Sequence, residues 1–282
     1  MLGWVLEGHG IWSPDDPQGY LAVSLEIERL GRAVGDPDLA FRGVRARATS
    51  MLERGDRLGL DGAIEGCEQL VRQWPQRHAR AVVAGMHAMR ALLGGRLDEA
   101  RRHVEASAEL GAGSGDLGFP AQIGAQQFAI HRDAGTLERI GPALAALRAR
   151  YPHLWGLRLL VALAAAEGGG PEAARAELAV FVRAALHRLP RDRNRLPTLA
   201  VAAEVAALVE AREAAVALEE RLSPYAGLNA VVGACGLFLG SVSHALGLTA
   251  LACGDAAAAR ERFAAACDMH ARLRAPAWQK RS

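Results

Sequence analysis

The residues that could carry out chemistry are few, and their spacing matches no catalytic motif. A Walker phosphate-binding loop needs a Gly-Lys-Ser/Thr segment, and Lys280 is the single lysine in the chain. The nine histidines show no HxxxH or HExxH spacing, and no GxSxG nucleophile elbow occurs. His131-Arg132-Asp133 shares three letters with a kinase catalytic loop, but a charge cluster at a helix end is the favoured interpretation. We therefore expect no metal and no cofactor and lean against an enzyme, although ligands assembled from distant helices stay open.

A glycine-rich connector at residues 111–118 contains a formal GxGxxG pattern that begins at Gly113. In dinucleotide-binding proteins this pattern follows a β-strand and opens a helix. No strand is predicted before it here, so the sequence does not favour a nucleotide site.

A basic run lies near the middle of the chain and consists of Arg188, Arg191, Arg193 and Arg195. A solvated loop, partly neutralised by Asp192, is favoured over a nucleic-acid patch. The net charge of +2 does not by itself indicate a polyanionic partner. We expect no direct contact with nucleic acid.

The cysteines and the N-terminus indicate a cytoplasmic protein. The cysteines, which show no CxxC spacing, are Cys67, Cys235, Cys253 and Cys267. Buried free thiols in a reducing compartment are the expected state. The first ten residues have neither a basic region nor a long apolar run, so we expect no signal peptide.

The stretch from Tyr225 to Gly254 carries no formal charge and is longer than the roughly 20 residues that cross a bilayer. We expect one long helix at residues 231–253, covered on both sides by neighbouring helices rather than by lipid, because glycines and polar residues interrupt it. Gly236 and Gly240 are predicted to be close packing contacts of this helix, and a larger side chain at Gly240 should overpack the contact. We expect a protein that does not enter the membrane.

A repeating pattern of small and aromatic residues organises the whole chain. Ala259, Phe263 and Ala266 share one helix face, and Gly247 lies where the preceding helix should cross it. This pattern is typical of a tetratricopeptide repeat, whose period is about 34 residues. The same phase recurs, at intervals of about 34 to 45 residues, from Ala63, Ala100, Ile140, Ala174 and Ala214. We predict an all-α, tetratricopeptide-like superhelix (an α-solenoid) of about six helix pairs rather than a generic helical bundle.

Turn residues place the helices within one domain of residues 1–282. The end of a helix is expected before Trp12, residues 1–36 are expected to form N-terminal capping helices, and residues 274–282 a C-terminal tail. No strand and no linker are predicted. Further helices are expected at residues 17–34, 37–54, 58–74, 75–94, 97–110, 119–134, 136–150, 153–167, 171–187, 196–211, 213–222 and 255–273.

The first helix of each pair should line a concave groove, which is the candidate binding site. The side chains that the repeat phase directs inward are Arg45, Thr49, Met86, Met89, Gln122, Gln126, Ser241 and His244. Most are neutral, and the two methionines are adaptable, so the groove suits a peptide or an apolar small molecule. We expect changing Gln126 or His244 to alanine to weaken binding with little loss of fold. The alternative is that these side chains contact only one another and water.

Several segments carry a resemblance to a known family. They are EGHGIW at residues 7–12, AMRALLGGRLDEA at 88–100, LPRDRNRLPTLA at 189–200, LSPYAG at 222–227 and ALGLTALACGD at 245–255. They resemble the helical-repeat region of bacterial LuxR-type ATP-binding transcriptional regulators and of similar regulators that carry a nucleotide cyclase domain. The resemblance implies a sensor or protein-binding arm and no catalytic residues. Arg195 stands where that family has tryptophan.

Two functions follow from these expectations. The first is a non-catalytic protein that binds a partner protein or peptide in bacterial transcriptional or signalling regulation. The second is a small-molecule-binding protein or enzyme that uses the concave groove. An open trough would favour the first function, and a deep pocket with converging polar groups would favour the second.

Overall fold

The computed structural model describes residues 12–113 and 118–282, and helices make up most of this part of the chain. The helices predicted between residues 17 and 222, and the one predicted after Gly254, are confirmed with ends within a few residues, except that the first part of the helix predicted at residues 136–150 is a 3-10 turn and the α-helix begins at Gly141. The helix end expected before Trp12 and most of the GxGxxG pattern lie outside the described residues. The helices are α2 (Pro17–Val34), α3 (Pro37–Arg54), α4 (Arg57–Gln73), α5 (Arg77–Leu93), α6 (Leu97–Gly111), α7 (Phe119–Asp133), α8 (Gly141–Arg150), α9 (Trp155–Glu167), α10 (Pro171–Ala184), α11 (Arg195–Leu208), α12 (Arg212–Leu222), α13 (Val242–Ala252), α14 (Ala256–Arg272) and α15 (Pro276–Arg281), with short 3-10 turns η2 (Leu137–Arg139), η3 (Leu186–Arg188) and η4 (Ser223–Tyr225).

Aspartates begin several of these helices, three of them at Gly-Asp turns. The Asp36 carboxylate accepts a hydrogen bond from the backbone N–H of Leu39, and Asp16, Asp56 and Asp255 make the equivalent bond. Such a cap satisfies one of the amide groups that a helix N-terminus leaves without a partner. These caps therefore set where helices α2, α3, α4 and α14 start, as the sequence predicts.

Consecutive helices pack against one another along the chain, consistent with a helical repeat. Most positions of the repeat phase are buried, among them Ala63, Ala100 and Ala174. The predicted crossing of α13 and α14 is confirmed, because a Cβ atom at Gly247 would lie 2.6 Å from the Phe263 ring. Small residues at the crossing allow the two helices to approach closely.

The predicted long helix at residues 231–253 is wrong. Its first half forms an antiparallel hairpin of β1 (Asn229–Val232) and β2 (Leu237–Ser241), and α13 begins only at Val242. Gly233 and Cys235 in the turn and Gly240 in β2 have positive φ angles, which interrupt a right-handed helix. Two apolar runs separated by a glycine-containing turn are a hairpin signal that the helical interpretation overlooked.

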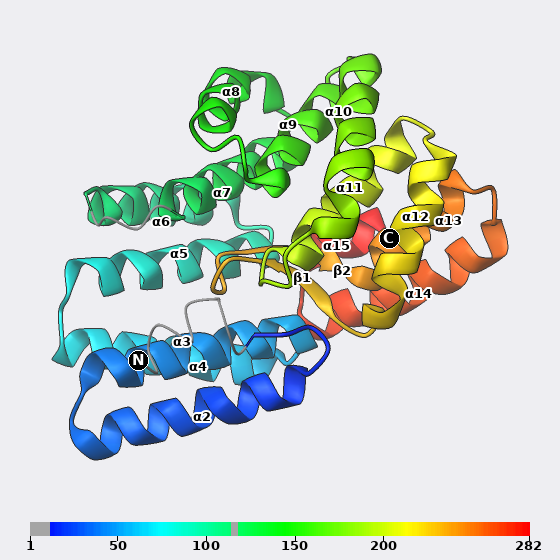
Figure 1. The fold of residues 1–282 in the computed structure, drawn as a ribbon. Coiled ribbons are helices and arrows are strands. Elements are labelled where there is room, and N and C mark those ends of the chain that lie inside the picture. The colour runs from blue at the N-terminus through cyan, green and yellow to red at the C-terminus, as the bar shows by residue number, and fades with distance from the viewer. Residues whose placement is uncertain (1–11, 114–117) are drawn as a thin grey trace.

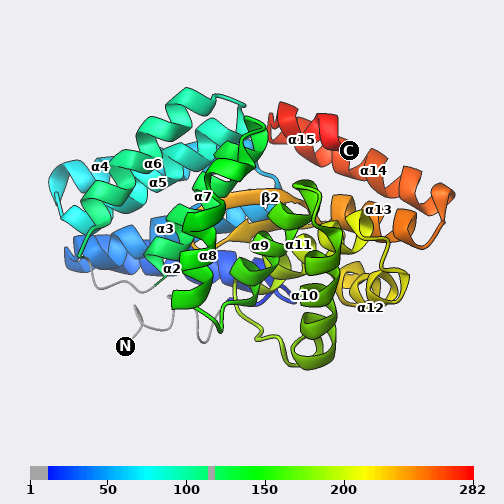
Figure 2. The same ribbon diagram turned by 90° about the horizontal axis from the view of Figure 1, so that it is seen from above.

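The hairpin lies in the middle of the molecule, between the two halves of the helical array. Figure 1 shows α2 to α7 stacked on one side and α12 to α14 on the other, with the strands between them. From above, the strands cross the space between these groups (Figure 2). Strand β1 contacts α3 and α11, while β2 contacts α5, α7 and α14. The inside of the array is therefore occupied by the hairpin and is not an open trough.

Polar contacts join the first helices to the last third of the chain. The Asn229 amide donates to the Leu52 carbonyl oxygen at 2.8 Å, and the Tyr225 hydroxyl donates to Asp15 at 2.7 Å. Arg57 donates to the Leu273 carbonyl oxygen at 3.0 Å. These contacts connect residues that are far apart in sequence and hold the array closed around the hairpin.

The C-terminal segment, expected as a tail, is an integral part of the fold. Residues Pro276–Arg281 form the short helix α15, and Trp278 in it is buried. The Trp278 ring contacts Phe238 of β2 edge to face, with 5.6 Å between ring centroids. Helix α15 therefore covers the hairpin at Phe238 of β2.

Candidate functional site

A cavity of about 720 Å³ lies between the hairpin and the inner helices. Helices α3, α5, α7, α9 and α11, the two loops before α9 and α11, and the hairpin all contribute to its wall. Its apolar lining residues are Val82, Phe119, Leu154, Leu157, Leu160, Leu189, Val201, Val232 and Leu239. A volume of roughly 300 to 1,000 Å³ with mostly apolar walls is typical of small-molecule sites.

Two arginines line the cavity. Arg45 comes from α3 and Arg193 from the loop before α11. Both charges oppose the burial that raises the pKa of Tyr20 to about 12, so both guanidinium groups lie near this α2 side chain. Asp192 is the acidic residue of the lining.

A buried carboxyl group close enough to be affected by Arg193, that of Glu53, is uncharged at neutral pH. Glu53 of α3 is buried and accepts a hydrogen bond from the Trp12 indole at 2.9 Å. Burial raises the pKa of Glu53 to about 8, although the Trp12 hydrogen bond and the Arg193 charge oppose this shift. The protonated group adds no negative charge beside Arg193.

Neutral polar side chains also line the cavity. Gln122 of α7 and Thr198 of α11 both line it, and neither side chain makes a hydrogen bond to another described residue. Asn194 uses its carbonyl oxygen to accept a hydrogen bond from the Gly233 backbone N–H at 3.2 Å, which leaves its amino group for other partners. Three neutral groups thus converge on a volume with apolar walls, as in sites that orient a ligand by a few polar contacts.

The structure brings only two of the eight predicted groove residues to this cavity, namely Arg45 and Gln122. Met86 and Met89 are buried in the hydrophobic core and do not line it. Thr49 is also buried and donates to the Arg45 carbonyl oxygen at 3.1 Å. The prediction of one common groove is wrong for these residues, because the hairpin covers the helix faces that were expected to be open.

Ser241 and His244 are not among the residues that line the cavity. The Ser241 hydroxyl accepts a hydrogen bond from the backbone N–H of His244 at 3.1 Å and begins helix α13. His244 itself is buried against the rings of Phe263 and Trp278. Neither residue is placed to contact a ligand in the cavity.

Gln126 attaches the hairpin to two helices. Its side chain is fully buried, and its amino group donates to the Gly85 carbonyl oxygen at 2.8 Å and to the Gly236 carbonyl oxygen at 2.6 Å. Gly236 also allows a close approach, since a Cβ atom there would overlap the Gln122 side chain. The expected close packing at Gly236 is confirmed, with a side chain of α7 as the neighbour.

We expect Gln126→Ala to lower the free energy of unfolding by about 2 to 4 kcal/mol, because two buried carbonyl groups lose their donor and a void forms. Gln127→Ala, on the same helix but partly exposed, should stay within roughly 0.5 kcal/mol of the unmodified protein. Urea denaturation of both variants measures the difference. Equal stabilities would show that Gln126 is not a structural residue.

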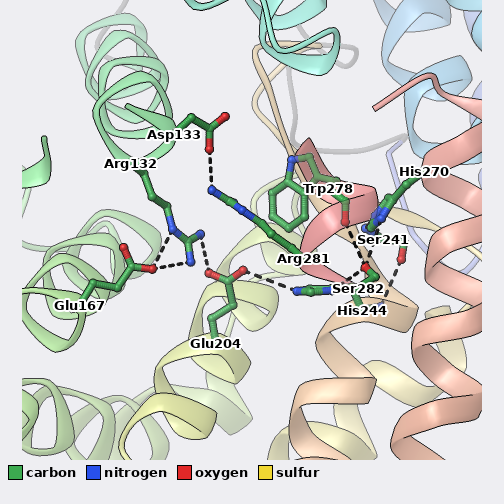
Figure 3. A network of polar contacts seen from close by, with 10 residues as sticks. All are labelled: Arg132, Asp133, Glu167, Glu204, Ser241, His244, His270, Trp278, Arg281 and Ser282. Atoms are coloured by element: carbon green, nitrogen blue, oxygen red, sulfur yellow. Dashed lines mark hydrogen bonds and ion pairs between the residues drawn. The ribbon is translucent and has the colours of Figure 1, made fainter. Parts of the chain in front are cut away.

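A second polar cluster joins helices α7, α9, α11 and α15 through ion pairs (Figure 3). Arg132 of α7 pairs with Glu167 of α9 at 2.6 Å and with Glu204 of α11 at 2.8 Å. Beside it, Arg281 of α15 pairs with Asp133 at 2.5 Å. The His131-Arg132-Asp133 segment is therefore a charge cluster at a helix end, as expected, and it holds helices together.

Two histidines continue this cluster through Ser282. The Ser241 backbone N–H donates to His270 Nε2 at 3.0 Å, so neutral His270 must carry its proton on Nδ1. That proton faces the Ser282 hydroxyl oxygen at 3.3 Å, and the same oxygen lies 2.8 Å from His244 Nδ1. Burial lowers the pKa of both His244 and His270 to about 4, so both are uncharged at neutral pH. The 4.0 Å between His244 Nε2 and Glu204 is too long for a hydrogen bond.

We expect this histidine pair to make the fold sensitive to acid. The pKa of His270 is about 4 in the folded chain against an ordinary value of 6.5, so the unfolded chain binds more protons between these values. Protonation of His270 should therefore lower the free energy of unfolding by on the order of 3 kcal/mol as the pH falls from about 7 to 4. Glu53 acts in the opposite direction between about pH 4.5 and 8, because its pKa is raised in the folded chain.

The contribution of His270 is isolated by comparing variants. His270→Gln keeps an acceptor for the Ser241 N–H but does not titrate, so its free energy of unfolding should fall less steeply with acid than that of the unmodified protein. His187→Gln, at an exposed position, should keep the original pH dependence. Parallel curves for all three proteins would contradict the assignment of a buried neutral imidazole.

A scan against models of known protein families finds no match for this chain, and a search of curated proteins finds none either. The resemblance to the LuxR-type regulators therefore stays a prediction. In the described residues, no helix is long and apolar enough to cross a membrane. No group of three or more His, Cys, Asp or Glu side chains there could hold a metal ion.

The sequence missed the loop residues that line the cavity. Within the basic run, Arg188 and Arg191 are exposed, as the solvated-loop interpretation predicts, but Arg193 lines the cavity together with Asn194. Thr198 was also not predicted as a lining residue, because it lies on α11, a helix with no clear polar face. The Asn-Arg-Leu-Pro-Thr segment at residues 194–198 carried no signal of a ligand site, since the other lining residues come from α3, α7 and the hairpin.

Proposed function

We propose that this chain is a helical-repeat protein that binds a small organic molecule in its central cavity. The observation that carries the proposal is the combination of a volume of about 720 Å³, apolar walls and polar side chains from α7, α11 and the loop before it. The sequence alone favoured a partner protein or peptide in an open groove. The hairpin occupies that groove, which supports the small-molecule alternative, with binding rather than catalysis as its role.

Native mass spectrometry of the purified protein tests this proposal directly. A bound molecule of small mass is the expected result, whereas a bound peptide would favour the partner-binding alternative. Regulation of transcription or signalling through such a partner remains a proposal that rests on the sequence resemblance.

A pair of variants locates the binding site. Ala121 lines the cavity from α7 and is partly exposed, so Ala121→Trp should fill the volume and abolish binding. Gln127→Trp adds the same ring to the same helix outside the cavity lining and should leave binding unchanged. Equal binding by both folded variants would mean that the cavity is not the site.

A further inference from the structure

We propose that the ligand of the cavity is an amphipathic anion, with a carboxylate or phosphate group held near Arg45 and Arg193 and an apolar body along α9 and α11. This inference rests on the proposed function and deepens it by naming the class of ligand. It follows from how charge, neutral polar groups and apolar groups are distributed over the cavity wall.

The charge at the α2 and α3 end favours an anion. Among the lining residues with a fixed charge, two are arginines and one is the aspartate Asp192. Asp192 Oδ1 already accepts a hydrogen bond from the Asn194 backbone N–H at 2.9 Å. Arginine is not deprotonated in proteins, so both guanidinium groups keep their charge whatever other contacts they make. Their planar donor groups match the geometry of carboxylate and phosphate oxygens.

The burial of Glu53 maintains this charge balance. Its carboxyl group lies close enough to Arg193 for the arginine to affect its pKa, but burial keeps it protonated at neutral pH. An ionised carboxylate at this position would compete with an anionic ligand. The uncharged form adds no negative charge beside Arg193.

The rest of the wall suits an apolar body. Leu154, Leu157 and Leu160 lie on one side, and Leu239 of the hairpin lines the cavity with them. Trp155 is held in its orientation by Arg158, whose guanidinium carbon lies 4.0 Å from the ring centroid. Burial of an alkyl or ring system against these side chains supplies affinity that does not depend on charge.

Gln122 and Thr198 supply neutral polar groups to the same cavity wall. Both line the cavity without a hydrogen bond to another described residue. They are therefore suited to a polar group that joins the anionic head to the apolar body, such as a hydroxyl or an amide.

Four probes with the same chain length test the class of ligand by calorimetric titration at concentrations below micelle formation. They are decanoate, decyl phosphate, decanol and decyltrimethylammonium. We expect one or both anions to bind at least tenfold more tightly than decanol and the cation not to bind. The relative affinities of decanoate and decyl phosphate then separate a carboxylate from a phosphate ligand.

Two variants and a matched control assign the charge preference to the proposed residues. Arg193→Gln and Arg45→Gln should each lower the affinity for the preferred anion about tenfold to a hundredfold while leaving that for decanol unchanged. Arg188→Gln changes an exposed arginine of the same loop that does not line the cavity, and it should bind as the unmodified protein does. Thermal melts identify any variant that fails to fold. If one arginine variant does not fold, the affinities of the other one decide whether the arginines cause the preference for anions.

The outcomes separate this inference from the proposed function. If decanol binds as tightly as the anions and both folded arginine variants behave like the control, the anion inference is wrong and the cavity remains a small-molecule site. If no probe binds and no small molecule copurifies with the protein, the proposed function itself is wrong. Loss of anion binding in Ala121→Trp together with the arginine effects would support both.

Discussion

Replacing Arg132 with methionine should lower the free energy of unfolding by about 3 kcal/mol, the lower part of the range for breaking a buried ion pair. The arginine lies between Glu167 and Glu204, and its side chain is 14% exposed. Its removal would leave two carboxylates facing each other across α9 and α11 without a cation between them. Their exposures of 25% and 11% allow some compensation by water, which is why the upper part of the range is not expected. Urea denaturation at neutral pH measures the loss.

A surface pair provides the control for the Arg132 prediction. Arg139 lies 3.9 Å from Glu138, and both side chains are more than 70% exposed. Arg139→Met should therefore change stability by less than about 1 kcal/mol. Adding Glu204→Gln to Arg132→Met should recover part of the lost stability, because one uncompensated charge is removed. If Arg132→Met is no more destabilising than Arg139→Met, the cluster does not hold the helices together.

Replacing Gly240 with alanine should cost about 3 kcal/mol of stability, through backbone strain and overpacking together. Gly240 has a φ of 86° in β2, a conformation that side chains with a Cβ atom rarely adopt. A Cβ atom there would lie 2.5 Å from Cζ3 of Trp278, which is buried against the hairpin. The sequence predicted a close contact at Gly240, and the structure confirms it with the Trp278 ring as the neighbour.

Gly254 separates the two causes of the Gly240 effect. Its φ of 80° is similar, but no heavy atom lies within 4 Å of the position of an added Cβ. Gly254→Ala should therefore show the backbone strain alone, about 1 to 2 kcal/mol. Gly240→Ala should lower the free energy of unfolding less in a Trp278→Leu protein than in the protein that keeps the tryptophan ring. Equal losses for Gly240→Ala and Gly254→Ala would mean that the Trp278 contact does not limit the size of residue 240.

The positions of the helices were determined by local features of the sequence. The Gly-Asp and Asp-Pro turns supply caps such as Asp36 and Asp255, and each cap acts within its own turn of helix. The small–aromatic pattern of Gly247 and Phe263 predicts one helix crossing. Gly247 lies on α13 and Phe263 on the next helix, α14, and the two residues are in contact. Such contacts join residues close in sequence and can be predicted from spacing alone.

The hairpin and the cavity were decided by tertiary contacts. Residues 229–241 are apolar and glycine-rich, and their composition is compatible with a buried helix as well as with a buried strand pair. The strand pair is stabilised by hydrogen bonds to residues far away in sequence. Gln126 donates to the Gly236 carbonyl oxygen, and Asn229 donates to the Leu52 carbonyl oxygen. Once the hairpin fills the inside of the array, Met86 and Met89 become core, whereas Arg193 and Thr198 line a cavity. The helix periodicity shows which residues share a face, but only the packing of distant segments determines which faces remain open to a ligand.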